Sequence, residues 1–436
     1  MHPTGLEQLR AEVRAIKTVR PVGRVVAVAG GALTVTGLSE LAAQGDLVEI
    51  RHGRGKPIAG EVIGLSSDGI SVLPEGSTDG ISIGDRVLLD GENAVAPDDS
   101  WIGRVIDPFG HPLDGRPLLR GVTPRPLRAP APAATERRSL GARLETGLAV
   151  FNTLLPLVRG QRIGLFAGSG VGKSTLLSML AQGVDADVVV IAMVGERGRE
   201  VREFIERVLG PEGMARSVIV AATSDRSPLV RRRCAWSAMA VAEHFREQGK
   251  HVLFLADSVT RFADAHREVA FAAGETGSLR GYPPSVTQMI TSLCERAGPG
   301  VEGEGDITAI FSVLVAGSDM EEPIADIIRG VLDGHVVLDR TIAERGRFPA
   351  IDLLRSVSRS LPLAATDEEN ALIGRARQRL GAYDRAEMMI QAGLYVPGSD
   401  AGIDAAIEAW PKLDAFIGRR ERDGIAGSFK ALAACL

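Results

Sequence analysis

Cysteines are rare in this chain, and their spacing excludes two kinds of site. The 436 residues include only three cysteines, at positions 234, 294 and 435, and no two of them form a CxxC pair. A disulfide framework and a cysteine-ligated zinc site both need such clusters, so both are excluded. We therefore expect the protein to work in a reducing cytoplasm.

The chain also lacks a strong excess of one charge and a long apolar run. Lys plus Arg number 50 and Asp plus Glu 55, giving a net charge of −5. This balance argues against a general nucleic-acid binder and leaves a local basic patch open. The longest apolar runs, such as 188–194, are far shorter than the ~20 residues that cross a bilayer. Residues 1–20 contain no apolar signal core.

Length and hydrophobic content predict several folded domains. At ~150 residues per domain the chain has room for roughly three. A hydrophobic content of 45% is enough to bury several cores. Glycine is abundant, with 51 residues, whereas aromatic residues make up only 4%. This combination is typical of tight turns and of ligand sites that are lined by backbone.

Residues 1–20 predict one short amphipathic helix. Its apolar residues recur at steps of three and four on one face, opposite the charges, and they are Leu6, Leu9, Val13 and Ile16. Two interpretations stay open. The stripe packs on its own domain, or the helix docks a partner protein.

Residues 21–92 are expected to form a small β-barrel. Their apolar residues alternate with period two. Glycine and aspartate turns separate short runs at 23–28, 32–36, 46–50, 60–65 and 85–89. Short strands at such regular spacing are typical of a barrel.

Residues 93–365 and 366–436 predict an α/β core followed by a helical domain. A proline-rich stretch at 124–133 indicates an extended, semi-rigid linker. Beyond it the βαβ pattern of a mostly parallel sheet emerges, with strand candidates at 161–167, 188–194, 218–222, 251–256 and 307–315. In the last segment Thr366 and Glu369 have the spacing of a capping box. Pro397 and Pro411 are expected to break the tail into short helices.

The strongest chemical signal is a glycine-rich loop between a predicted strand and a predicted helix. After Ala167 it consists of Gly168, Ser169, Gly170, Val171, Gly172, Lys173, Ser174 and Thr175. In such a loop, backbone N–H groups wrap phosphates, the lysine reaches the β- and γ-phosphates, and the serine hydroxyl ligates Mg²⁺. The strict pattern GxxxxGK[ST] has glycine where Ala167 stands, so only its first glycine is missing.

Two acidic residues follow predicted strands of the same sheet. Asp257 ends the apolar run 252–256, where it can hold Mg²⁺ through water or merely cap a helix. Because a phosphate loop is predicted in the same sheet, we favour the metal-binding role of Asp257 over the helix cap. Glu196 follows the strand 188–193 and would lie at the carboxyl edge, where such sheets bind ligands. There it could polarise an attacking water, or belong to a solvated charged turn.

Together these motifs resemble those of the hexameric rotary ATPases, which comprise the catalytic subunits of the ATP synthase head and their type III protein-export relatives. The resemblance covers nearly the whole chain in order. It implies a RecA-like P-loop core between the barrel and the helical domain, with ATP and Mg²⁺ as ligands. By matching, Glu196 activates the hydrolytic water, and Arg197 supports its turn and the γ-phosphate. Asp257 matches the second Walker acid, Arg261 an arginine near the phosphates, and Phe348 the aromatic that stacks on adenine.

Arg359, which ends the run Ser-Val-Ser-Arg, matches the family's arginine finger. In the family this residue crosses to the γ-phosphate of the neighbouring subunit. In the ATP synthase head the catalytic glutamate and the finger come from different chains, whereas this chain carries both Glu196 and Arg359. The resemblance therefore implies a homohexamer with six equivalent interfaces. It favours the protein-export branch. The loop Ala-Gly-Ser-Gly-Val-Gly-Lys-Ser resembles that of the flagellar export ATPases in particular.

The same resemblance implies partners and a location. The N-terminal helix would bind a stator-like regulator, and the loop 274–284 would face a central stalk protein in the ring. Complexes of export substrates with their chaperones and an export gate at the inner membrane complete the set, without nucleic acid. The enzyme would associate peripherally with the cytoplasmic face of that membrane.

The expected function is thus Mg-ATP hydrolysis coupled to the export of flagellar proteins, with the injectisome ATPase of virulence secretion as the alternative. An ATP synthase catalytic subunit is less favoured, because one chain carries both glutamate and finger. A ring-shaped RNA translocase needs base-stacking aromatics in its barrel, and residues 21–90 contain no Phe, Tyr or Trp. A nucleotide-gated scaffold without catalysis is disfavoured by the intact set of Lys173, Glu196 and Arg359.

Overall fold

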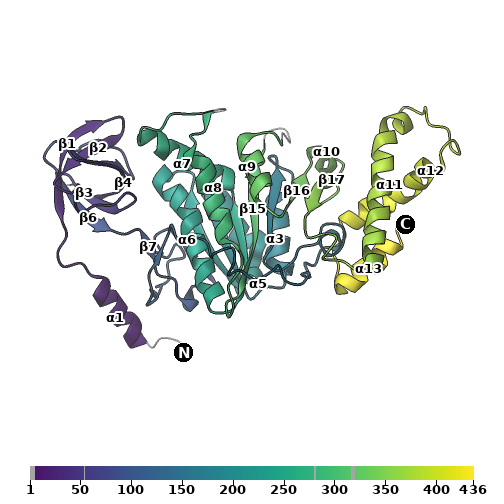
Figure 1. Cartoon of the computed structure of the whole chain (residues 1–436), viewed down its shortest axis with the longest axis horizontal. Helices are drawn as coiled ribbons and strands as arrows, with labels where there is room; N and C mark the ends of the chain where they lie inside the picture. Colours follow the sequence, from purple (N-terminus) through teal and green to yellow (C-terminus); the bar gives the residue numbers. More distant parts are fainter. Residues whose placement is uncertain (1–4, 54, 279–280, 316–319) are drawn as a thin grey trace.

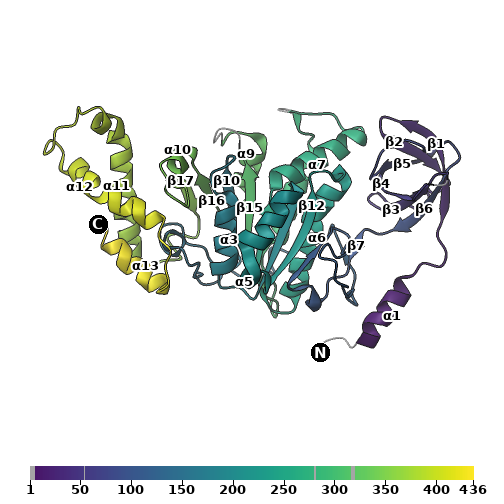
Figure 2. The same ribbon diagram turned by 180° about the vertical axis from the view of Figure 1, so that it is seen from behind.

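The chain is laid out as a barrel, a central sheet and a group of helices in a row. The computed structural model describes residues 5–53, 55–278, 281–315 and 320–436. The barrel and the C-terminal helices lie at opposite ends, with the helix-covered sheet between them (Figure 1). The same order is seen from behind (Figure 2). None of the helices in these ranges is long and apolar enough to cross a membrane.

The N-terminal helix α1 (Gly5–Ala15) is shorter than the predicted segment and leaves its apolar stripe uncovered. Its Gln8 side chain is buried and donates a hydrogen bond to Asp98 at 2.8 Å. The stripe residues are 56–66% exposed, and they are Leu6, Leu9, Val13 and Ile16. The interpretation that the stripe packs on its own domain is therefore wrong.

The predicted barrel is present and closed. In the part of the chain that the structure describes, six strands pair in the order β1-β2-β5-β4-β3-β6, with bounds Val22–Ala29, Ala32–Thr36, Gly69–Pro74, Ile58–Ser66, Leu47–Arg51 and Arg86–Gly91. Strand β5 was not predicted. Its Ile70 and Val72 point into the barrel core and are fully buried, and its pairing with β2 and β4 closes the barrel.

The central sheet is mostly parallel, as predicted. Its strands follow the order β17-β16-β10-β15-β13-β11-β12-β8, and their bounds are Ile351–Ser358, Gly334–Leu338, Arg162–Ala167, Asp306–Leu314, His251–Asp257, Val188–Glu196, Ser217–Thr223 and Arg104–Ile106. β17 runs antiparallel to β16, and β14 (Gly298–Pro299) runs antiparallel to β15. Four strands of this sheet were not predicted, namely β8, β14, β16 and β17.

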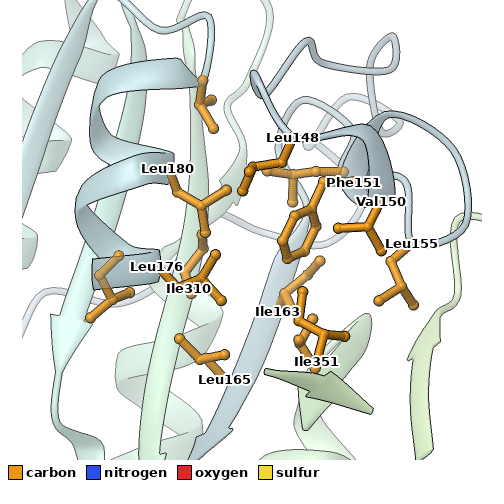
Figure 3. Packing of buried hydrophobic residues seen from close by; sticks show 14 of the residues in the cluster. Leu148, Val150, Phe151, Leu155, Ile163, Leu165, Leu176, Leu180, Ile310 and Ile351 are labelled. Atoms are coloured by element: carbon orange, nitrogen blue, oxygen red, sulfur yellow. The ribbon is translucent and has the colours of Figure 1, made fainter. Parts of the chain in front are cut away.

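Both faces of this sheet are covered, which explains its continuous apolar runs. In β11, Val189, Ile191 and Met193 pack into one core, and the alternating Val188 and Val190 pack into the other. The first core includes Leu176 and Leu180 of α3 (Figure 3). The helices of this part of the chain are α2 (Ala149–Asn152), α3 (Lys173–Gly183), α4 (Gly198–Glu203), α5 (Gly210–Met214), α6 (Pro228–Glu247), α7 (Val259–Ala272), α8 (Ser285–Arg296), α9 (Pro323–Val331) and α10 (Arg340–Glu344). Phe204–Leu209 forms a π-helical turn and Asp99–Trp101 a 3₁₀ turn.

The C-terminal segment folds into α11 (Asp367–Gln391), α12 (Ala401–Ile417) and α13 (Gly424–Ala433). The capping box of Thr366 and Glu369 opens α11, as predicted. Pro397 lies between α11 and α12, but Pro411 lies inside α12, so its predicted break is wrong. Buried residues on either side, such as Ala409 and Leu413, hold the helix together and offset the lost backbone hydrogen bond.

The proline-rich stretch 124–133 is not a free linker. Arg125–Pro126 forms the short strand β9, which pairs with β7 (Ala94–Val95). Arg125 donates to Glu247 of α6 at 2.6 Å, and Leu127 is buried. Tertiary contacts thus fix a segment whose composition indicates a spacer.

A buried ion pair ties the barrel to the core. Glu61 of β4 accepts a hydrogen bond from Arg232 of α6 at 2.6 Å, and both side chains are about 5% exposed or less. Arg128 reaches the same carboxylate at 3.4 Å. Both guanidinium groups lie over the ring of Trp236, that of Arg128 at 4.7 Å and that of Arg232 at 5.5 Å from the ring centroid. One buried carboxylate therefore compensates two guanidinium groups at this junction.

Replacing Glu61 with alanine should lower the free energy of unfolding by about 3 kcal/mol, because Arg232 would stay buried without its counter-charge. Denaturant unfolding measures the change. The control is Glu206→Ala, which removes the exposed partner of Arg202 and should cost less than about 1 kcal/mol. Equal effects of the two substitutions would contradict a structural contribution of the Glu61 pair.

Candidate active site

The phosphate loop, residues 167–175, lies between β10 and α3, as its motif predicts. Gly170 and Gly172 have φ angles of 77° and 88°, a left-handed conformation that glycine adopts without strain. Gly172 caps the helix, and Lys173 is its first residue. Ala167 is the fully buried last residue of β10 and pairs with Leu314. An extended position in the sheet needs no glycine, which explains the one departure from the motif.

A pocket of about 1270 Å³ opens above this loop. It is lined by residues 167–175 together with Glu196, Arg197 and Arg261, so the structure brings most of the predicted residues together. Because the parallel strands β10, β11 and β13 all end here, the pocket lies at the carboxyl edge of the sheet.

Asp257 does not line the pocket itself but contacts Lys173, which does. Asp257 ends β13 and is buried, and the Lys173 ammonium group donates to it. Ser312 of β15 donates a second hydrogen bond to the same carboxylate oxygen, at 2.8 Å. The Asp257 carboxylate is thus held by the first residue of α3 and by the neighbouring strand β15.

Glu196 reaches the same lysine from β11. A β-bulge at Gly195, with φ 69°, turns the strand end so that the Glu196 carboxylate lies 3.7 Å from the Lys173 nitrogen. Its side chain is only 13% exposed. Burial raises the pKa of Glu196 to about 7. The negative charge of Asp257 adds to this shift, and Lys173 opposes it.

The donor set fits a magnesium ion that is shared with a nucleotide. Within the described ranges there is no group of three or more His, Cys, Asp or Glu that could hold a metal alone. Ser174 lines the pocket, and Asp257 lies behind that lining in contact with Lys173. Mg²⁺ in such enzymes takes one or two protein oxygens and completes its shell with phosphate and water. These two side chains therefore suit a metal that arrives with the phosphates.

Three further predicted residues surround the loop. Arg197 is 81% exposed at the mouth of the pocket and pairs with Glu200 at 3.2 Å. Arg261 lines the pocket from the first turn of α7. Phe348 is 52% exposed, and a Cβ added at Gly172 would meet its ring at 3.2 Å. The aromatic ring therefore lies against the phosphate loop, with one side open.

Arg359 is not part of this pocket. Ile351 pairs with Leu338, which is level with Ala167, and β17 then runs away from the loop. Arg359 lies eight residues farther on, a distance of about 26 Å along an extended strand. It is exposed and donates to the carbonyl of Arg329 at 3.2 Å. The chain cannot place this arginine in its own site.

Sequence reasoning missed several residues that line the pocket, among them Asp264 and Arg355. Asp264 lines the pocket one helical turn after Arg261, and that three-residue spacing is a signal that could have revealed it. Arg355 lines the pocket from β17. No signal pointed to Arg355, because β17 itself was not predicted.

Replacing Lys173 with alanine should raise the pKa of Glu196 above about 7, because the one nearby charge that lowers it is removed. The carboxyl ¹³C shift of Glu196, followed by NMR against pH, measures the change. Lys412→Ala removes a lysine that pairs with the exposed Glu408, and it should leave the titration of Glu196 unaltered. An unchanged or lower pKa in the Lys173 variant would contradict the observed contact.

Comparison with known families matches two adjoining parts of the chain. Residues 147–358 match the model of the nucleotide-binding domain of the ATP synthase alpha/beta family. Residues 365–434 match the model of the T3SS EscN ATPase C-terminal domain. The first range contains the phosphate loop, both carboxylates and Phe348.

Full-length relatives and solved structures are similar over most of the chain. The flagellum-specific ATP synthase of Caulobacter vibrioides is 45% identical, over 95% of this chain and 96% of the relative. That of Salmonella typhimurium is 41% identical, over 95% and 93%. The assembled ATPase EscN from the type III secretion system of enteropathogenic E. coli superposes with a TM-score of 0.87 at 35% identity, covering 95% of this chain and 99% of EscN. EscN in complex with its central stalk EscO gives a TM-score of 0.85, also at 35% identity and with the same coverage.

Proposed function

The chain belongs to the ATP synthase alpha/beta family and is an ATPase, and from this premise we propose that it hydrolyses Mg-ATP to drive flagellar protein export. The observation that carries the catalytic part is the meeting of Lys173, Asp257 and Glu196 beside the phosphate loop. The flagellar assignment is supported by relatives from several bacteria that are described as flagellum-specific ATP synthases. The match of residues 365–434 to the EscN model makes an injectisome ATPase the second candidate.

Substrate binding follows from the charges in the pocket. The backbone N–H groups of residues 168–172 and the Lys173 ammonium group would hold the phosphates. Lys173 would leave its contacts with Asp257 and Glu196 for the phosphates. Ser174 and, indirectly, Asp257 would hold Mg²⁺, which neutralises phosphate charge when bound. Phe348, already against the loop, would stack on the adenine.

Glu196 would act on the attacking water. It is positioned by the bulge at Gly195 and is partly shielded from solvent. A carboxylate whose pKa lies near the working pH is an efficient base for a water proton. Arg197 and Arg261, at the mouth and on α7, would hold the γ-phosphate and the neighbouring phosphate oxygens.

The arginine finger requires a second copy of the chain. Arg359 lies too far from its own phosphate loop to act there, and its exposure leaves it accessible to a neighbour. A ring in which every subunit supplies both Glu196 and Arg359 would be a homohexamer with six equivalent sites. The similarity to an EscN structure described as assembled supports such a ring.

Partners follow from exposed segments and from the relatives. The uncovered stripe of α1 would bind a stator-like regulator. The loop 274–284 would face a central stalk protein, since EscN was solved with its stalk EscO; Leu279 and Arg280 lie outside the described residues. Chaperone-bound export substrates and an export gate at the inner membrane would be further partners, with the enzyme held peripherally on the cytoplasmic face.

Two inactive variants should restore activity when they are mixed. Lys173→Ala lacks the phosphate contact and Arg359→Ala lacks the finger, so each alone should hydrolyse ATP at a small fraction of the normal rate. In randomly mixed rings, about a quarter of the interfaces combine an intact Lys173 with an intact neighbouring Arg359. We expect about a quarter of wild-type turnover in a phosphate-release assay of the mixture.

The control for this experiment mixes Lys173→Ala with a Lys173→Ala, Arg359→Ala double variant, which has no intact interface and should stay inactive. A failure of the first mixture to recover, or full activity of Arg359→Ala alone, would refute a finger that acts between subunits.

The cellular assignment is tested by a chromosomal Lys173→Ala substitution. We expect loss of swimming and of flagellar filaments with normal growth, because export would lack its ATPase. Motility in soft agar and filament staining measure this, with Lys412→Ala as the matched lysine control. Motile cells that fail to secrete virulence proteins would instead identify an injectisome ATPase, and a growth defect would contradict both export assignments.

A further inference from the structure

Tyr282 joins the loop after α7 to the nucleotide pocket. Its hydroxyl donates a hydrogen bond of 2.8 Å to Asp264 of α7. Asp264 lines the pocket and is one helical turn beyond Arg261. A single hydrogen bond therefore connects a pocket wall with residues that lie outside the pocket.

Arg267 holds this contact from the same helix. Its guanidinium lies 4.7 Å over the Tyr282 ring and 3.3 Å from the Asp264 carboxylate. Burial raises the pKa of Tyr282, with the Asp264 charge as a further cause, so the phenol stays a neutral donor. Helix α7 thus supplies both the acceptor and the cation that orient the tyrosine.

The backbone of Tyr282 sets the position of its loop. The Tyr282 carbonyl accepts two hydrogen bonds from Ser278, one from its backbone amide at 3.0 Å and one from the Ser278 hydroxyl at 2.7 Å. On the other side, His266 of α7 contacts the Ser285 hydroxyl at 2.9 Å and anchors the start of α8. The described residues 274–278 and 281–284 are here called the Tyr282 loop. A shift of Tyr282 would act on this loop through Ser278, while α8 is anchored separately by His266.

We propose that the Asp264–Tyr282 hydrogen bond couples nucleotide occupancy of the pocket to the Tyr282 loop, and that bound nucleotide weakens this bond. The proposal rests on the proposed nucleotide site and adds a regulatory link to it. Asp264 and Tyr282 are positioning residues here, and neither is assigned a part in the chemistry.

The direction of the coupling follows from charge. Nucleotide phosphates bring negative charge into a pocket of which the Asp264 carboxylate forms part of the wall, and like charges repel. Asp264 is 25% exposed and is held by Tyr282 and Arg267 near the surface, whereas Asp257 is buried and is held by Lys173 and Ser312. Coupling between two sites is reciprocal. If bound nucleotide weakens the Asp264–Tyr282 hydrogen bond, then removing that bond must increase the affinity for nucleotide.

The experiment compares hydrogen exchange of the Tyr282 loop with and without saturating Mg-ADP, in the full chain and in Tyr282→Phe. In the wild-type chain, Mg-ADP should increase exchange in peptides from this loop. In Tyr282→Phe, exchange should already be high and should no longer respond to Mg-ADP. Calorimetry should show a Kd for Mg-ADP that is about two- to tenfold lower, since a hydrogen bond to a carboxylate no longer opposes binding.

Tyr395→Phe is the matched control. The Tyr395 hydroxyl donates to Asp404 at 2.9 Å, the same kind of contact, on the helical hairpin far from the pocket. This variant should bind Mg-ADP and respond in the Tyr282 loop as the wild type does.

The outcomes separate the two proposals. Absence of Mg-ADP binding to the wild-type chain would refute the nucleotide site itself. Binding with unchanged or decreased loop exchange, or a normal loop response in Tyr282→Phe, would overturn the coupling and leave the site intact.

Discussion

The positive charge of Lys173 between two buried carboxylates is the interaction on which the site depends. Asp257 and Glu196 come from neighbouring strands, and without the lysine their charges would repel in a partly dry pocket. The lysine is placed there because β10 and α3 are joined by a loop of glycines. The same charge that holds the carboxylates together is the one that phosphates would attract.

The rest of the fold keeps this arrangement in register. Two apolar cores bury both faces of the sheet and hold β10, β11 and β13 together. The barrel is fixed to α6 by the Glu61–Arg232 pair. Helix α7 connects most of these parts, since it begins beside Asp257 and contacts the pocket, the Tyr282 loop and α8. The position of α7 therefore sets both the pocket residues that it carries and their contacts with the Tyr282 loop.

Local patterns predicted much of the fold and of the pocket. Five strands of the parallel core could be predicted because they are continuous apolar runs. The phosphate loop could be predicted because glycines at this spacing before Lys-Ser are specific for phosphate binding. Strand β17 was missed because its exposed Leu354, Arg355 and Val357 break any simple pattern at the end of the sheet. The effect of Pro411 was predicted wrongly. The backbone hydrogen bond that proline removes is a local property, whereas the packing of α12 that offsets the loss involves residues far away in the sequence.

The sequence by itself indicated the phosphate loop, Asp257 and Glu196 as candidate site residues and most of the strands and helices, because backbone preference and side-chain character are local properties. Only the tertiary structure decided which of these residues meet. It joined Lys173 to Asp257 and Glu196, kept Arg359 at the far end of β17, left the stripe of α1 uncovered and set Tyr282 against Asp264. The physical reason is that strand pairing and burial depend on contacts between residues far apart in the chain, which no short window of sequence contains.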